Sequence, residues 1–147
     1  ACLDMAASSA PVLEDHVAER AGGVVAAGGL DPRGAERVPG AYDMIEHELA
    51  DKVLILQWSE FGRRPNQNNS LGTDHGTASS LFIIGNPVAG GLYGEQPSLE
   101  AAALDEAGNL KFTVDFRSVY ATVIDGWLGV DSEQVLGARY ENVGFIR

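Results

Sequence analysis

The sequence predicts an α/β fold whose sheet is mostly parallel. The strongest observation is the apolar run at residues 52–58 (KVLILQW), which is rich in branched residues and typical of a strand buried on both faces. A helical pattern over residues 41–50 directly precedes this run, and a helix next to a buried strand favours a βαβ-type arrangement. A second apolar run at residues 80–85 (SLFIIG) predicts another short buried strand.

The residues before position 52 give weaker signals. Residues 11–20 predict a short helix that ends at a glycine pair. Residues 24–30 are small and apolar, and fit either a short strand or a loop. Residues 31–40 contain several prolines and glycines and predict irregular structure. Residues 41–50 have apolar side chains at helical spacing and predict a helix.

The second half of the chain alternates loops with short elements. Residues 59–79 are polar, with glycines and asparagines, and predict a long loop of the kind that is usually functional or mobile. Residues 86–94 predict a turn, and residues 110–114 a short strand. Asp115 is suited to cap the N-terminus of a helix, which Gly129 would end. The apolar stripe of this helix predicts core packing and consists of Phe116, Val119, Tyr120, Val123 and Trp127.

Composition narrows the classes of function. The 147 residues suit one domain, and the 45% hydrophobic content argues against disorder. The formal net charge of -11 makes the chain repel nucleic acid, so we expect no nucleic-acid partner. No apolar run is long enough for a transmembrane segment, and the first ten residues lack the pattern of a signal peptide. The single cysteine, Cys2, excludes an intrachain disulfide.

Four motifs stand out because they occur in series. They are WSEFGRR at residues 58–64, GTDHGT at residues 72–77, GGLYG at residues 90–94, and DFRSVYAT at residues 115–122. Their order and spacing resemble the DUF1501 family, across roughly residues 52–146. On this resemblance the chain divides into a poorly matched N-terminal segment, residues 1–50, and a DUF1501 C-terminal region, residues 51–147.

The resemblance implies several further properties. One is a partial alkaline-phosphatase-like three-layer sandwich, from a wider superfamily that contains phosphatases, sulfatases and metal-dependent phosphomutases. Another is export to the periplasm, because family members typically begin with a twin-arginine signal. Enzymes of that superfamily hold divalent metals with Asp and His at the carboxyl ends of strands.

A divalent-metal site is therefore expected near the polar loop. Glu60 directly follows the first predicted strand, and Asp74 and His75 lie in the loop that leads to the second. Ligands of open α/β sheets bind beyond the carboxyl ends of the strands, and carboxylates and imidazoles suit zinc, manganese or iron. Arg63 and Arg64 are adjacent and are candidates for binding a phosphate or sulfate anion.

Two placements of the superfamily motif compete. In one, Asp74 and His75 form its Asp-His-Gly metal pair. In the other, which we favour, Glu60 and Phe61 occupy the place of the strand-end Asp-His, and His75 is a later ligand. The second placement implies at least one altered ligand, because a phenylalanine cannot bind metal.

The upstream parts of such a site are poorly represented. Asp31 is a candidate for the family's further Asp ligand, but Arg33 stands where the family has a His. No Ser or Thr near the candidate site has a recognisable nucleophile context. No catalytic residue is therefore assigned, and little or no turnover is expected.

Two hypotheses for function follow. The first is a C-terminal DUF1501 fragment with a residual divalent-metal site, related to metal-dependent phosphate and sulfate ester hydrolases but lacking the nucleophile. The alternative is a non-enzymatic binding or envelope-associated module that uses the long polar loop as its contact surface. A partial sheet also leaves an exposed strand edge, through which we expect the chain to self-associate.

Overall fold

The computed structural model describes the backbone of residues 24–28 and the whole of residues 46–147. The predicted helix at residues 11–20 and candidate ligand Asp31 lie outside these ranges, as does half of the predicted helix at residues 41–50. Of the described residues in this range, Glu46 is helical and turns follow up to Lys52, whose N donates to Leu49 O at 2.8 Å.

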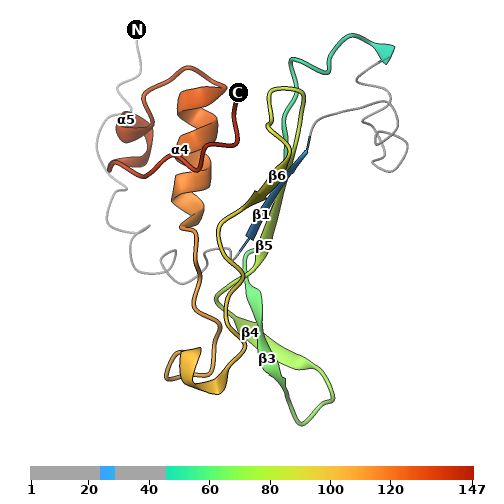
Figure 1. Ribbon diagram of the computed structural model, residues 1–147, viewed down its shortest axis with the longest axis vertical. Helices are drawn as coiled ribbons and strands as arrows, with labels where there is room; N and C mark the ends of the chain where they lie inside the picture. Colours follow the sequence, from blue (N-terminus) through green and yellow to red (C-terminus); the bar gives the residue numbers. More distant parts are fainter. Residues whose placement is uncertain (1–23, 29–45) are drawn as a thin grey trace, which may run out of the picture.

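A four-stranded mixed sheet forms the centre of the described fold (Figure 1), in the order β2-β5-β1-β6. Its strands are β1 (Val24–Gly28), β2 (Ile55–Gln57), β5 (Ser80–Ile84) and β6 (Gly91–Tyr93). Only β1 and β5 run parallel, whereas β2 pairs antiparallel with β5 and β6 pairs antiparallel with β1.

The prediction of a mostly parallel sheet is therefore wrong. The apolar run at residues 52–58 indicated a strand buried on both faces, but only Ile55–Gln57 pairs, and it lies at the edge of the sheet. Lys52 and Trp58 are exposed, and Trp58 keeps 54% of its surface accessible. The run is apolar almost throughout, yet its side chains are only partly buried. Hydropathy alone therefore predicted a central parallel strand where the chain forms an antiparallel edge strand.

The residues of the predicted long loop form a β-hairpin. Strand β3 (Gly62–Gln67) pairs antiparallel with β4 (Thr73–Gly76), and the two continue the β2–β5 ribbon beyond the main sheet, away from the helices (Figure 1). The register shifts between Arg63 and Gln67. Pro65 lies in this interval and has no N–H to donate to a ladder, which accounts for the irregularity.

Two helices lie on one side of the sheet (Figure 1): α4 (Phe116–Gly126) and α5 (Ser132–Leu136). The predicted cap is confirmed, because the carboxylate of Asp115 accepts from Arg117 N at 2.8 Å. A 3-10 turn, η1 (Ala101–Ala103), lies in the long connection before α4. The predicted strand at residues 110–114 is not formed.

The core lies between the sheet and α4. Its buried members come from β5, the turn after it, α4 and the C-terminal segment, and are Leu81, Ile83, Val88, Val119 and Phe145. The opposite face of the sheet exposes Phe82 at 48% and Leu92 at 76%, both of which pair with Ala26 and so share a face. The described part thus has two layers, and the predicted three-layer sandwich is not formed within it.

Among residues 24–28 and 46–147, no helix combines the length and apolarity that a membrane crossing requires.

Candidate functional site

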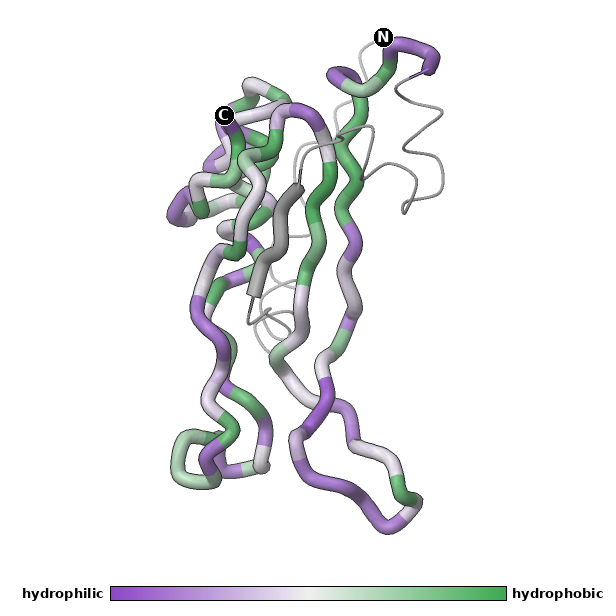
Figure 2. The backbone as a smooth tube through the Cα atoms, turned by 45° about the vertical axis from the view of Figure 1, so that its right-hand side comes forward, coloured by the Kyte–Doolittle hydropathy of each residue, from purple (hydrophilic) through white to green (hydrophobic). Residues whose placement is uncertain are grey.

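Two of the four sequence motifs meet on the β3–β4 hairpin. Gly62 pairs with Gly76 and Arg63 pairs with His75, so the WSEFGRR and GTDHGT motifs lie side by side. Figure 2 shows this hairpin as largely hydrophilic, in contrast to the hydrophobic strands that it continues. The hairpin and the bend that leads into it are the candidate functional site, because the described candidate residues named from the sequence lie there.

The glycine pair lets the two strands of the ribbon approach closely. A Cβ on Gly62 would lie 1.6 Å from Ala78 O, inside the backbone of the connection between β4 and β5. A Cβ on Gly76 would lie 2.9 Å from both Arg63 C and Arg64 N. Both glycines of the motifs are therefore explained by backbone packing alone.

An aromatic stack covers one face of the hairpin base. The rings of Phe61 and His75 are parallel within 14°, with centroids 3.7 Å apart. The guanidinium carbon of Arg63 lies 5.0 Å from the Phe61 centroid, and Arg63 Nη1 donates to Thr73 O at 2.9 Å. Arg63 and His75 are exposed, so this stack of a cation and two rings lies at the surface.

The opposite face of the base is tied to the connection before α4. Arg64 Nε donates to Asn109 Oδ1 at 3.0 Å, and Thr77 Oγ1 donates to Leu110 O at 2.6 Å. Asn109 is itself held by Asp105, whose Oδ1 accepts from Asn109 N at 2.7 Å. Hydrogen bonds from Asn109 lower the pKa of Asp105 below its ordinary value, because they stabilise the charged carboxylate.

The tip of the hairpin is built around Asn68. Its Oδ1 accepts from Ser70 N at 3.0 Å and Gly72 N at 3.1 Å, and its Nδ2 donates to Asp74 Oδ1 at 2.9 Å. Its backbone N–H donates to Gly72 O at 2.8 Å, and its carbonyl accepts from Leu71 N at 3.1 Å. These bonds fix a turn in which Leu71 has a φ of 61° and is 81% exposed.

The candidate metal ligands point in different directions. Asp74 bonds to Asn68 and the ring of His75 stacks on Phe61, while Glu60 is exposed at the bend before β3. Neighbouring residues in a strand face opposite sides, so Asp74 and His75 diverge. Within the described part of the chain, no three His, Cys, Asp or Glu side chains gather closely enough to hold a metal ion.

The described candidate ligands are therefore not gathered into one cluster. The adjacent arginines diverge in the same way as Asp74 and His75. Arg63 lies over Phe61, whereas Arg64 bonds to Asn109 at the base of the hairpin. The metal and anion sites stay predictions.

Sequence reasoning missed Leu71. The sequence feature that could have indicated it is a single leucine within the polar run of residues 66–72, NQNNSLG. No hydrophobic periodicity there assigns this leucine to a core. Its exposure follows from the Asn68 turn, which depends on contacts that sequence patterns do not specify.

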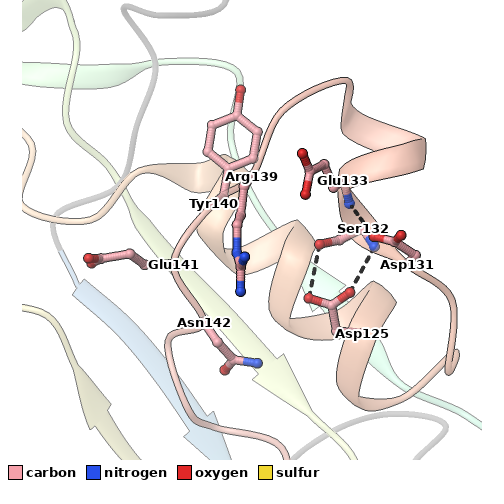
Figure 3. Close-up of a pocket in the computed structure, with 8 residues that line it drawn as sticks. All are labelled: Asp125, Asp131, Ser132, Glu133, Arg139, Tyr140, Glu141 and Asn142. Carbon is pink, nitrogen blue, oxygen red and sulfur yellow. Dashed lines mark hydrogen bonds between the residues drawn. The ribbon is translucent and has the colours of Figure 1, made fainter.

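A second feature missed from the sequence is a cavity of about 730 Å³ where α4, α5 and the C-terminal segment meet (Figure 3). Half of its lining residues are acidic, and the lining consists of Asp125, Asp131, Ser132, Glu133, Arg139, Tyr140, Glu141 and Asn142.

Two carboxylates of this cavity, Asp125 and Asp131, bind the first turn of α5. Figure 3 shows Asp125 facing Ser132, whose N–H and Oγ donate to the carboxylate at 2.8 and 2.9 Å. Asp131 caps α5 by accepting from Glu133 N at 3.0 Å. The buried Ser132 hydroxyl is engaged with Asp125 in this joint between α4 and α5.

The fold and the hairpin together define a small mixed α/β unit that displays a surface ribbon. Comparison with family models places it more closely: the model described as "Protein of unknown function (DUF1501)" matches residues 41–138, which is more than half of the chain. The chain therefore belongs to the DUF1501 family, as the four motifs predicted. No curated protein and no solved structure matches it significantly. The relation to alkaline phosphatases and sulfatases stays a prediction.

Proposed function

We propose that this DUF1501 region is a non-enzymatic binding module that contacts a protein partner through the tip of the β3–β4 hairpin. The proposal rests on the exposure of Leu71 and on its backbone conformation. This side chain is 81% exposed, and its φ of 61° lies in a region that leucine rarely adopts. Neither its exposure nor its backbone conformation stabilises the fold, so a role in binding accounts for both.

The tip is also preorganised. Five hydrogen bonds centred on Asn68 hold the turn before any partner arrives. A rigid display loses little conformational entropy on binding, so a single apolar side chain contributes more to affinity than it would on a mobile loop.

The charge of the hairpin supports a protein partner. Between Glu60 and Thr77, two arginines balance two carboxylates, whereas the whole chain carries a net charge of -11. The hairpin is thus the part that approaches another protein with little electrostatic repulsion. We infer that the partner offers an apolar pocket for Leu71 and polar groups for the surrounding amides.

Site-specific photo-crosslinking tests this function. A photoreactive amino acid replaces Leu71 in one chain and Leu99, which is 66% exposed, in a control chain. In an extract of the producing cells we expect one saturable adduct from position 71 and none from position 99. Unlabelled wild-type chain should compete for the adduct, and Leu71→Asn chain should not. Equal competition by both chains would refute the role of the tip.

The hydrolase-related alternative is tested on the same preparation. A residual divalent-metal site at Glu60, Asp74, His75 and Asp31 would give stoichiometric zinc or manganese by elemental analysis, lost in His75→Ala. Turnover of aryl phosphate or sulfate esters by the purified chain would overturn the non-enzymatic assignment. We expect neither bound metal nor turnover.

A further inference from the structure

The β3–β4 hairpin acts as a lever on the rest of the molecule. Its two strands form a sheet of their own, and in the described part neither is hydrogen-bonded into the main sheet. Figure 1 shows the hairpin extending beyond that sheet, beside the connection that carries η1. Strand β3 spans six residues, or about 17 Å from end to end, so a rotation of about 10° at its base would move its far end by about 3 Å.

Two side-chain hydrogen bonds tie the base of this lever to the connection before α4. Arg64 Nε on β3 donates to Asn109 Oδ1 at 3.0 Å, and Thr77 Oγ1, directly after β4, donates to Leu110 O at 2.6 Å. One bond therefore comes from each side of the ribbon, and both end on neighbouring residues of the connection. We call these two bonds the latch.

The acceptor side of the latch is fixed before the hairpin contacts it. Asn109 is 9% exposed, and its Nδ2 donates to Asp105 Oδ2 at 2.9 Å. Asp105 Oδ1 also accepts from Asn109 N at 2.7 Å and from Ala107 N at 2.9 Å. The amide of Asn109 is thus held from one side, and its Oδ1 faces Arg64. The negative charge of Asp105 attracts the Arg64 guanidinium as well.

The orientation of the hairpin matters for a contact made at its tip. In preorganised complexes the interface backbone moves by less than about 1 Å on binding. The displacement of about 3 Å that a small rotation would cause exceeds this tolerance. The hydrogen bonds around Asn68 shape the turn but do not orient it, so the base of the hairpin must be fixed as well.

We propose that Arg64 and Asn109 are positioning residues for the partner contact of Leu71, because the latch holds the hairpin in its binding orientation. This inference rests on the proposed function of the hairpin tip. It assigns a role in binding to two residues that lie away from the contact itself. Opening of the latch lets the hairpin sample several orientations, and the apparent affinity falls with the fraction of time spent in the competent one.

The latch is tested without any partner by a distance measurement on the full chain. In a Cys2→Ser background, spin labels are attached at Asn69→Cys in the tip and at Val135→Cys on α5, where the native valine is 59% exposed. We expect one narrow distance distribution for this labelled chain and a broader one after adding Arg64→Ala or Asn109→Ala. The double variant should broaden no further, since both substitutions remove the same bond.

The control is Asn86→Ala, which removes a side-chain hydrogen bond of the same kind, from Asn86 Nδ2 to Asp51 Oδ1 at 2.8 Å, in the turn after β5. Its distribution should stay narrow. Arg64→Ala leaves the Asp105–Asn109 bonds in place, so it tests the latch even where Asn109→Ala disturbs the loop. Variants with distributions as narrow as that of the unmodified chain would overturn the latch.

The positioning role is tested by competition for the adduct at position 71. Unlabelled Arg64→Ala and Asn109→Ala chains should need concentrations about three to ten times higher than wild type to compete equally, which corresponds to a competent fraction of roughly a tenth to a third. The Asn86→Ala chain should compete as wild type does. Broadened distances with unchanged competition would overturn the positioning role alone. Absence of any adduct would refute the proposed function, while the distance measurement would still decide whether the latch exists.

Discussion

Gly62 and Gly76 show how strongly single residues determine the hairpin. They face each other across the ribbon, and each adjoins backbone that leaves no room for a side chain. Arg63 and His75 adjoin these glycines in the motifs but are exposed, so we expect substitutions there to disturb the packing less. At the residue scale, these two positions require glycine because the backbone beside each of them lies too close for a side chain.

Replacing Gly62 with alanine should therefore destabilise the chain severely. A Cβ would lie 1.6 Å from Ala78 O, and the backbone must shift to relieve the clash. We expect a loss of about 3 kcal/mol in the free energy of unfolding, measured by denaturant titration. Gly72→Ala is the matched control, because the nearest atom to its Cβ would be Asn68 Oδ1 at 3.9 Å. Equal effects of both substitutions would contradict the packing argument.

Leu71 gives the opposite prediction, that a substitution stabilises the chain. Asparagine adopts the left-handed region more readily than leucine does, so Leu71→Asn should raise the free energy of unfolding by about 0.5–1 kcal/mol. Leu99→Asn is the control, since Leu99 is also exposed and has no positive φ. A loss of stability in Leu71→Asn would show that Leu71 contributes to the fold rather than to binding.

At the scale of elements, α4 is fixed at its first turn by the Asp115 and Arg117 pair. Arg117 Nη2 lies 2.7 Å from Asp115 Oδ2, and its guanidinium carbon lies 4.8 Å from the centroid of Tyr140 in the C-terminal segment. Burial acts to raise the pKa of Asp115, but the hydrogen bonds and charge of Arg117 outweigh it and hold the pKa below its ordinary value. Arg117 thus links the helix cap, through its ion pair with Asp115, to the C-terminal segment, through its contact with the Tyr140 ring.

This pair predicts a dependence of stability on pH. Since the pKa of Asp115 is lower in the folded than in the unfolded chain, its contribution is complete above the unfolded value of 3.8 and disappears as the pH falls through the folded pKa. Asp115→Asn keeps a capping side chain but loses the charge. The variant should melt below wild type at pH 7, and the difference should narrow at pH 3 and below. A difference that is constant over pH would exclude the ion pair as its source.

Elements with local determinants were predictable from the sequence. The α4 cap and the strand at residues 80–84 follow from side chains within one turn or one strand, whereas of the predicted apolar stripe only Val119 and Val123 join the core. The direction of the edge strand β2 was not, because it depends on which strand lies beside it. The hairpin was missed because its ladder is stabilised by glycines, asparagine and a stacked ring pair rather than by alternating apolar residues.

For the whole molecule, the C-terminal segment completes the core. Phe145 is fully buried, Val88 pairs with Ile146, and Val143 N donates to the buried hydroxyl of Thr122 at 2.8 Å. The segment thereby connects α4 to the turn between β5 and β6. The sequence indicated the region of the candidate site but not its geometry, because Glu60, Asp74 and His75 lie at or beside the hairpin without converging.

Phe145→Ala should consequently affect the entire fold. Removing the ring leaves a cavity among Ile83, Val88 and Val119, and we expect a loss of about 3–5 kcal/mol in the free energy of unfolding. The control is Phe112→Ala, because Phe112 is 42% exposed and should cost much less. Comparable losses for the two phenylalanines would contradict the position of the core.

The glycine pair of the hairpin also affects how related sequences are classified. Selection for a crossing that tolerates no side chain acts on every descendant that keeps the ribbon, whatever chemistry the ancestor performed. A lineage whose other side chains changed around this crossing would retain the two glycines. A genome survey that scores these glycines would therefore detect the ribbon, and not any one chemistry.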